Sequence, residues 1–352
     1  MTSALRQSWP RPRRPLPIVI VGAGGIVRSA HLPAYRALRL PVLGVFDVMP
    51  RRARELARAW RIPRVYSSLA DAARERGVVY DLAVPGDQVL PVLRALPPRA
   101  AVLIQKPLGR DLAEARRILV LARSRRFAAA VNFQLRFSPN MLALRDVIER
   151  GQLGEIRDVE VRVCTHTPWG LWKFMSGIPR LEILYHSIHY LDLLRSLFGE
   201  PRGVHAWAGG DPERPRYADT RSTIVLDYAH RLRCAVHTNH LHVFGPKRAA
   251  SEIKVEGTKG AALARMGVNL EYPRGRPDTL ELARLGGPWR SIRLRGSWFP
   301  RAFEGTMSSL QRFATGESRE LPTAVADAAR TMALVEACYR SAARAGTPVP
   351  AV

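Results

Sequence analysis

The sequence is poor in cysteine and has no long apolar run. Its three cysteines, Cys164, Cys234 and Cys338, are far apart and odd in number, which argues against a disulfide scaffold and suits reduced core residues in a cytosolic protein. None has the spacing of a metal site or of a catalytic thiol. No stretch approaches the ~20 apolar residues of a membrane span. We therefore expect a cytoplasmic protein with no membrane partner.

The first apolar run follows Arg13 and Arg14, an order that resembles the charged and apolar regions of a signal peptide. Because the run leads directly into a glycine turn, a first buried strand explains it better.

Lysine is also scarce. The chain has 55 basic residues and a formal net charge of +25, and nearly all of the basic residues are arginine. Such a charge favours nucleic-acid binding when Lys and Arg cluster. Here the arginines are spread from Arg11 to Arg344, with only a short run at 11–14, and no nucleic-acid-binding motif is recognisable. We expect no nucleic-acid partner, and binding of a duplex through the positive surface is the alternative.

With 352 residues the chain is long enough for two domains, since single cores stop growing at roughly 250 to 300 residues. Residues 1–15, rich in Pro and Arg, predict a flexible arm. Residues 16–135 alternate short apolar runs with helical stretches, which predicts a doubly wound parallel sheet, the Rossmann fold of dinucleotide-binding domains. The expected strands lie at Ile18–Val21, Val42–Phe46, Val78–Val84 and Ala101–Ile104.

Residues 136–352 have a different pattern of apolar and polar residues. Longer alternating runs at Ile156–Val163, Ser222–Tyr228 and Leu232–His237 predict an α+β domain on a large, mostly antiparallel open sheet with one solvated or interface face. We expect this domain to bind substrate and to form a homodimer or homotetramer. Residues 324–345, rich in Ala and Arg, predict one long final helix that can return to the first domain.

The turn Gly22-Ala23-Gly24-Gly25 follows the first expected strand. A pyrophosphate needs backbone N–H groups that it can approach closely, and a helix N-terminus supplies them together with a favourable dipole. Gly22 and Gly24 occupy the first two places of the dinucleotide fingerprint, whereas Val27 stands where a third glycine or alanine is usual. A tight strand-to-helix connection without a ligand is the alternative for the turn taken alone.

Asp47 ends the second expected strand about 20 residues after the turn. Its carboxylate can accept hydrogen bonds from the adenosine ribose hydroxyls and would repel a 2′-phosphate, which favours NAD over NADP. Arg51 and Arg52 lie near enough in the sequence to bind a 2′-phosphate, so NADP is not excluded.

From residue 16 onward the chain resembles the Gfo/Idh/MocA family, the group of glucose-fructose oxidoreductase and inositol dehydrogenase. The order of the matching segments carries the resemblance. They are Val84-Pro85, Gln105-Lys106-Pro107-Leu108, residues 131–139 with Arg136, 151–156, His189-Tyr190-Leu191-Asp192, 255–260 and Leu321-Pro322-Thr323.

In that family the lysine of a Glu-Lys-Pro segment and an Asp-x-x-x-His pair lie at the nicotinamide. The resemblance implies that Lys106 and His189 hold a substrate hydroxyl and move its proton as hydride leaves. Tyr185 stands where the aspartate is expected, Gln105 where the glutamate is expected, and Val89 where a histidine often occurs. The expected cofactor-binding residues are Gly22, Gly24, Gly25, Ile26, Asp47, Val84, Pro85, Gln105 and Lys106.

Residues 182–197 have apolar positions at helical spacing. At about 100° per residue, Glu182, His186 and His189 fall within one ~60° arc, and Tyr185 lies at its edge. One glutamate and two histidines on one stripe can serve as a proton relay and substrate clamp. A metal site is the alternative, but the pattern lacks an obvious further ligand, so we expect no metal.

Two further segments are candidates for the substrate pocket. His237, His240 and His242 lie on an expected strand, where period two places His240 and His242 on one face and His237 on the other. Either face can line the pocket; a polar sheet face or an interface is the alternative. The loop with Trp169 and Trp172 can cover a sugar-like ring, or it can be a packed loop or a dimer contact.

The sequence therefore predicts an NAD-dependent oxidoreductase for a secondary hydroxyl or keto group of a sugar, cyclitol or related polyhydroxylated molecule. The expected catalytic residues are Lys106, Tyr185, His186 and His189, and the expected substrate-binding residues are Lys106, Arg136, Trp169, Trp172, Glu182, His186 and His189. Because Tyr185 replaces the family aspartate, the alternative is a non-catalytic sensor that binds dinucleotide and regulates a partner protein.

Overall fold

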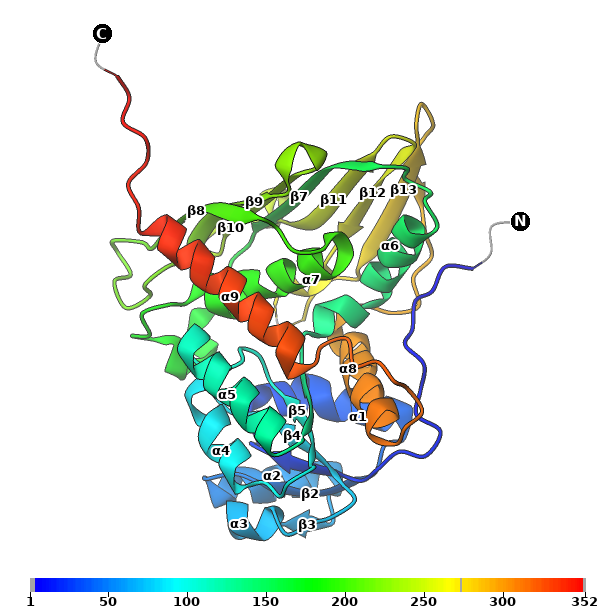
Figure 1. The fold of residues 1–352 in the computed structure, drawn as a ribbon, viewed down its shortest axis with the longest axis vertical. Coiled ribbons are helices and arrows are strands. Elements are labelled where there is room, and N and C mark those ends of the chain that lie inside the picture. The colour runs from blue at the N-terminus through cyan, green and yellow to red at the C-terminus, as the bar shows by residue number, and fades with distance from the viewer. Residues whose placement is uncertain (1–3, 273, 351–352) are drawn as a thin grey trace. The chain divides into compact units, whose positions relative to one another are not determined.

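The computed structural model describes residues 4–272 and 274–350, and these residues divide into two compact units (Figure 1). Unit 1 takes the chain up to residue 143 together with 295–332, and unit 2 takes 144–294 together with the chain from 333. The expected boundary at 135 is close to the first of these divisions. The expectation that all of 136–352 belongs to the second domain differs from the structure, because 295–332 groups with unit 1.

Unit 1 is built on a parallel sheet with the order β3-β2-β1-β4-β5-β6, as the alternating pattern predicts. Three of its strands are buried along their whole length, because apolar residues occupy both faces of a central parallel strand. The strands are β1 (Ile18–Val21), β2 (Val42–Phe46), β3 (Arg64–Val65), β4 (Val79–Leu82), β5 (Ala101–Ile104) and β6 (Ala128–Val131).

The helices of unit 1 include one that the sequence pattern predicts for the second domain. Helix α8 (Trp298–Ala314) packs against α1 and strands β5 and β6, because its apolar residues Phe303, Met307 and Leu310 are buried in the same core as β1. The other helical segments are η1 (Val27–His31), α1 (Leu32–Leu38), α2 (Pro50–Trp60), α3 (Leu69–Ala72), η2 (Gly86–Gln88), α4 (Val89–Ala95), α5 (Leu112–Ser124) and η3 (Gln134–Phe137).

The amino-terminal segment has no helix or strand in its described part, as expected, but it is not loosely packed. The N–H of Arg13 donates to the Glu317 carboxylate at 2.9 Å, and the ring of Trp9 lies 4.9 Å from that of Phe137. Both partners belong to unit 1. The expected flexible arm is therefore attached to this unit by specific contacts from residue 7 onward, including one from Gln7 to the N–H of Arg295.

Unit 2 is built on an eight-stranded sheet in the order β14-β13-β12-β11-β7-β10-β9-β8. Only β7 and β10 pair in parallel; the other neighbours are antiparallel, which confirms the expected mostly antiparallel sheet. The strands are β7 (Ile156–Cys164), β8 (Gly203–Gly209), β9 (Arg221–Asp227), β10 (Arg233–Asn239), β11 (Ala250–Gly257), β12 (Gly260–Arg265), β13 (Thr279–Arg284) and β14 (Arg290–Ser291).

Burial alternates along β9, β10 and β11, so one face of this sheet is covered and the other is open. The helical segments of unit 2 are η4 (Trp169–Leu171), η5 (Lys173–Met175), η6 (Ile183–Ser187), α7 (Ile188–Phe198), η7 (Ala229–Arg231), η8 (Pro246–Arg248) and η9 (Gly267–Asn269). Two helices, α6 (Pro139–Glu149) and α9 (Val325–Ala342), each begin in unit 1 and end in unit 2. The predicted final helix is present as α9, and its residues 325–332 group with unit 1.

Among the described residues, none of the helices is long and apolar enough to cross a membrane.

Cys234 and Cys338 are buried, as expected of core thiols, and burial raises the pKa of each to about 12.

Candidate functional site

The turn after β1 needs glycine at its first position. Gly22 has a φ of +104°, and a Cβ there would lie 2.4 Å from the carbonyl oxygen of Ala83, on the neighbouring strand. Its N–H donates to the carbonyl of Phe46 at 2.8 Å. Gly22 is therefore fixed by the fold of the protein itself.

Gly24 and Gly25 differ from Gly22, because a Cβ at either position would meet no atom within 4 Å. The helix begins at Gly25, and the N–H groups of a first helical turn, here including Ile26, have no intrahelical acceptor. The open space above these N–H groups fits a pyrophosphate that approaches the backbone. Val27, where a small residue is usual, is fully buried at the point where the helix widens into the π-helical turn η1.

Asp47 ties this turn to the end of β2. One carboxylate oxygen accepts the N–H of Ala23 at 2.7 Å, and the other accepts the N–H of Met49 at 2.8 Å. The contact with the ribose hydroxyls stays a prediction, but the structure places the carboxylate beside the glycine turn, as that prediction requires. Arg51 pairs with Glu55 at 2.7 Å on the surface.

The other expected cofactor residues follow the carboxyl ends of β4 and β5. The N–H of Gln105 continues the parallel ladder by donating to the carbonyl of Leu82 at 2.8 Å. Val84 and Pro85 come two and three residues after the end of β4 and are half-buried and exposed, respectively. Since parallel strands end at the same edge of the sheet, these residues share that edge with Gly22, where open α/β sheets bind ligands.

Lys106 comes two residues after β5, at the same edge. It keeps part of its surface accessible, yet the surrounding protein desolvates the ammonium group and lowers the pKa of Lys106 to about 8. A lysine with this pKa can hold a substrate oxygen as a cation below pH 8 and loses its proton within the neutral to mildly alkaline range.

Arg136 lies in η3 and is buried. Its guanidinium contacts the Asp327 carboxylate at 2.6 Å and donates to the carbonyl of Pro322 at 3.0 Å, both in unit 1. These contacts attach the first turn of α9 to unit 1, and binding of substrate by Arg136 stays a prediction.

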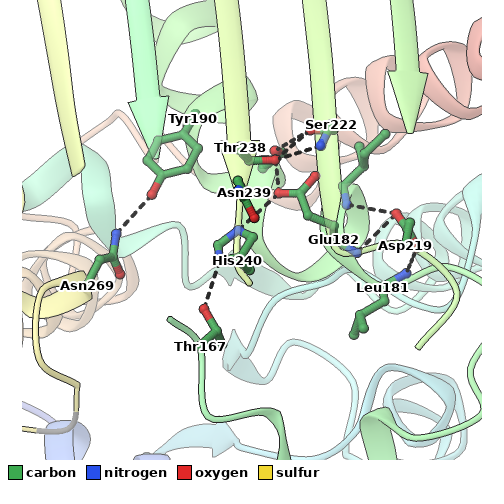
Figure 2. A network of polar contacts seen from close by, with 12 residues as sticks. Thr167, Leu181, Glu182, Tyr190, Asp219, Ser222, Thr238, Asn239, His240 and Asn269 are labelled. Carbon is green, nitrogen blue, oxygen red and sulfur yellow. Dashed lines mark hydrogen bonds and ion pairs between the residues drawn. The ribbon is translucent and has the colours of Figure 1, made fainter. Parts of the chain in front are cut away.

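In unit 2, a buried carboxylate holds the start of the segment with the expected histidines. Asp219, which precedes β9, accepts the N–H groups of Leu181 and Glu182 at 2.7 and 3.1 Å (Figure 2). The hydroxyl of Tyr339 donates to the same carboxylate at 3.1 Å. Burial, partly opposed by these hydrogen bonds, raises the pKa of Asp219. A carboxylate here stabilises the first N–H groups of a helix that has no cap of its own.

Glu182 and His240 form a buried pair. Their side chains have 0% and 3% exposure, and Glu182 Oε1 lies 3.3 Å from His240 Nε2. Ser187 donates to Glu182 at 2.7 Å, while His240 Nδ1 lies 2.8 Å from Thr167 Oγ1 (Figure 2). Burial opposes ionisation of Glu182, but the hydrogen bond and charge of His240, with help from Ser222 and Ser187, lower the pKa of Glu182 below its usual value.

His186 and Trp169 complete this cluster. The ring of His186 lies 4.4 Å from that of His240 and 4.8 Å from that of Trp169, and the Trp169 ring lies 5.6 Å from His240. The structure thus brings together the expected residues Glu182, His186 and Trp169. Each of these three residues contacts His240.

The remaining expected residues of unit 2 are less central to this cluster. Tyr185 packs toward Phe174 at a ring distance of 5.9 Å, and Trp172 lies 5.4 Å from Tyr272. His189 is buried in the first turn of α7. Because η6 is a π-helical turn with i to i+5 hydrogen bonds, the 100° spacing used to place these side chains on one arc does not hold between 183 and 187.

The expected strand with three histidines is correct only for His237. Strand β10 ends at Asn239, so His240 and His242 lie beyond it, and the period-two argument fails for both. His240 turns into the interior, whereas His242 is half-buried and its Nε2 lies 3.1 Å from the carbonyl of Gly245. Sequence reasoning missed the role of Asp219, which lies in a loop and has no periodic signal.

The stripe of Glu182, His186 and His189 left a metal site as an alternative. Within the described part of the chain, no group of three or more His, Cys, Asp or Glu side chains is arranged to hold a metal ion. The Glu182 Oε1 atom lies 3.3 Å from Nε2 of His240.

Comparison with known proteins matches both units to one family. Residues 16–133 match the oxidoreductase family with an NAD-binding Rossmann fold, and residues 141–263 match the GFO/IDH/MocA C-terminal domain. The trans-1,2-dihydrobenzene-1,2-diol dehydrogenase of Bos taurus is 30% identical over 250 residues, 68% of this chain and 71% of that protein. The chain belongs to the Gfo/Idh/MocA family. It is an NAD-binding oxidoreductase.

Two further proteins match over more of their length. The inositol 2-dehydrogenase of Rhizobium meliloti is 26% identical over 336 residues, 92% of this chain and 96% of that protein. The crystal structure of an Agrobacterium radiobacter oxidoreductase in complex with NAD+, L-tartaric acid and magnesium superimposes with a TM-score of 0.77 at 20% identity, covering 94% of this chain and 97% of that one. The second match shows that the two proteins share their fold over nearly the whole chain.

The contrast between the glycines of the turn gives a prediction. Gly24→Ala adds a methyl group where the protein leaves space, so we expect an unchanged Tm and an NAD Kd raised at least about 10-fold, because the methyl group occupies the path of the pyrophosphate. Gly22→Ala, the matched substitution, should lower the Tm because its Cβ meets the Ala83 carbonyl. Differential scanning calorimetry and titration of NAD measure both effects; an unchanged NAD affinity in Gly24→Ala would contradict the assignment.

The Glu182–His240 pair gives a second prediction. The folded protein lowers the pKa of Glu182, so ionised Glu182 stabilises the protein above its unfolded pKa of about 4.3, and this contribution is lost as pH falls below that value. Glu182→Gln should reduce the free energy of unfolding by about 3 kcal/mol at pH 7, because it leaves His240 without its buried partner. In urea melts at pH 4 and below, the difference in the free energy of unfolding between Glu182→Gln and the unchanged protein should be smaller. Glu213→Gln, at an exposed position, is the control; an equal deficit at both pH values would argue against the pair.

Proposed function

We propose that this oxidoreductase transfers hydride between NAD and a secondary hydroxyl or keto group of a sugar, cyclitol or related polyhydroxylated molecule. The observation that carries the proposal is Lys106, a desolvated lysine with a lowered pKa at the sheet edge that also carries the glycine turn and Asp47. The names of the relatives, a dihydrodiol dehydrogenase and an inositol dehydrogenase, support a substrate with neighbouring hydroxyl groups.

Each group of residues has a part in this reaction. When bound, NAD supplies the hydride acceptor or donor. The N–H groups from Gly24 to Ile26 bind its pyrophosphate, and Asp47 binds the adenosine ribose. Lys106 holds the reacting hydroxyl oxygen through its ammonium group, and His189 or His186 takes the hydroxyl proton during oxidation and returns it during reduction.

The buried cluster of unit 2 supports the substrate-binding role of its residues. Trp169 is buried against the rings of His186 and Tyr217, so it supports the placement of His186 within this cluster. The carboxylate of Glu182 fixes His240, and the His240 ring in turn supports His186, which leaves His186 oriented for proton exchange. Tyr185 and Trp172 border this cluster.

The catalytic role of Lys106 is tested by substitution and by pH. Lys106→Ala should lower kcat/KM at least about 100-fold while the NAD Kd stays nearly unchanged, because the lost group acts on the substrate oxygen. In the unchanged enzyme, kcat/KM for oxidation should fall as pH rises through about 8, where the ammonium group loses its proton. Stopped-flow measurement of NADH with a panel of polyols checks both. Full activity of Lys106→Ala would refute this role, and NAD binding without turnover on any substrate would favour a dinucleotide sensor.

We propose that the protein is cytoplasmic, as its few cysteines suggest. We assign the open face of the unit 2 sheet to the contact between subunits of a homodimer or homotetramer. Trp207 of β8 and Val225 of β9 are 54% and 39% exposed on neighbouring strands of this sheet. Replacing Trp207 with Glu should shift the mass measured by light scattering toward the monomer, because a charge opposes burial of this face. Val243→Glu, at an exposed loop residue, is the control; an unchanged mass in Trp207→Glu would reject this surface.

A further inference from the structure

Unit 1 buries a second carboxylate–histidine pair that the reaction above does not use. His31, at the end of the π-helical turn η1, has 1% exposure, and its Nδ1 lies 2.7 Å from Oδ2 of Asp81, which is fully buried in β4. The Tyr35 hydroxyl donates to the same carboxylate oxygen at 2.7 Å. Burial and the charge of Asp81 raise the pKa of Tyr35 far above its usual value, so Tyr35 stays a donor.

Asn132 connects this pair to the edge of the sheet. Its side-chain nitrogen lies 3.3 Å from Nε2 of His31 and donates to Oε1 of Gln105 at 2.9 Å. With the Asp81 carboxylate as acceptor, His31 carries its proton on Nδ1, so Nε2 accepts one N–H of Asn132. The other N–H of Asn132 is then directed at Gln105.

Backbone hydrogen bonds also hold the carboxyl ends of β4, β5 and β6 in register. The N–H of Asn132 donates to the carbonyl of Ile104 at 2.7 Å, and the N–H of Gln105 donates to that of Leu82 at 2.8 Å. Gln105 and Asn132 are thus the first residues after β5 and β6, and Lys106 is the next residue after Gln105. The polar chain from Asp81 to Gln105 ends one peptide bond from the lysine.

A buried polar chain contributes little to stability compared with apolar packing, but it defines one geometry because each donor has one acceptor. Replacing Asn132 with an apolar residue leaves Nε2 of His31 and Oε1 of Gln105 without the N–H groups of Asn132. The His31 ring also lies 5.2 Å from the ring of Phe303, which belongs to the buried core of unit 1.

We propose that Asp81, His31 and Asn132 are positioning residues that fix the side chain of Gln105 and, through its backbone, the placement of Lys106 against the substrate oxygen. This role rests on the proposed function of Lys106. Asn132 acts as the double donor in the centre of the chain, and Asp81 acts at a distance by setting the tautomer of His31.

Asn132→Leu tests the proposal, because leucine has nearly the same shape and removes both donors. The NAD Kd should stay within about 2-fold, since the glycine turn is untouched, whereas kcat should fall about 10-fold or more with a smaller change in KM. The pKa of Lys106 should rise from about 8 toward the usual value of about 10.4, because a less fixed ammonium group regains solvent. Unchanged kcat and unchanged Lys106 pKa would overturn the proposal.

The pKa of Lys106 can be read without a substrate. NMR titration of the 13C-dimethylated protein resolves the few lysines of this chain, and a Lys106→Arg variant assigns the signal. If no polyol is turned over by the unchanged protein, the proposed function fails, but the titration of Asn132→Leu with NAD bound still decides whether Asn132 places Lys106.

A pair of substitutions at His31 guards against a simple folding defect. The side chain of Gln at position 31 places an acceptor where Nε2 stands, whereas that of Asn places a donor where Nδ1 stands. His31→Gln should therefore retain the low Lys106 pKa and most of kcat, and His31→Asn should lose both. If the two variants have a similar Tm and show the same Lys106 pKa and the same kcat, the proposed hydrogen-bond chain through Asn132 is wrong.

Discussion

A carboxylate that is removed from water must be given a partner inside the protein, and this constraint organises the core of both units. In unit 1 the buried Asp81 is paired with His31, and in unit 2 the buried Glu182 is paired with His240. Each pair lies beside a π-helical turn, η1 or η6. His31 is the last residue of η1 and Glu182 directly precedes η6, so each pair includes a residue at one end of a widened helical turn.

The carboxyl edge of the parallel sheet is the second organising feature. Because all six strands of unit 1 run in one direction, their ends supply the glycine turn, Asp47, Gln105 and Asn132 at one edge, although these residues are separated by as many as 110 positions. Asp81 is the last residue but one of β4, so its pair with His31 lies just inside that edge. The same sheet therefore explains why a lysine that follows β5 is both accessible to a ligand and desolvated enough to have a pKa of about 8.

The elements of the fold were predictable where the signal is local. The β-branched run at Ile18–Val21 and the glycines after it predict a buried strand and its turn, and the structure has that strand at those residues. The membership of α8 in unit 1 was not predictable, because nothing in its sequence tells which of two sheets its apolar face covers.

The site was predictable to a smaller extent. Lys106, Glu182 and His186 could be singled out because each is an unusual residue type for its segment. The partners of the buried carboxylates, His31 and His240, could not be assigned, because each lies about 50 residues or more from its carboxylate and pairing at that range leaves no periodic signal. His240 in particular looked like a strand residue, and only the end of β10 at Asn239 turns it inward.

Tyr185 stands where the family resemblance implies an aspartate, and the structure gives a reason why the histidines of this helix still have a carboxylate nearby. Glu182 lies three residues earlier and reaches His240 at 3.3 Å, and the His240 ring packs against His186 at 4.4 Å. The negative charge is thus held in the interior by Ser187 and His240, while Tyr185 turns toward Phe174. In the proposed reaction Glu182 supports His186 through the His240 ring, so the proposal does not require an aspartate at position 185.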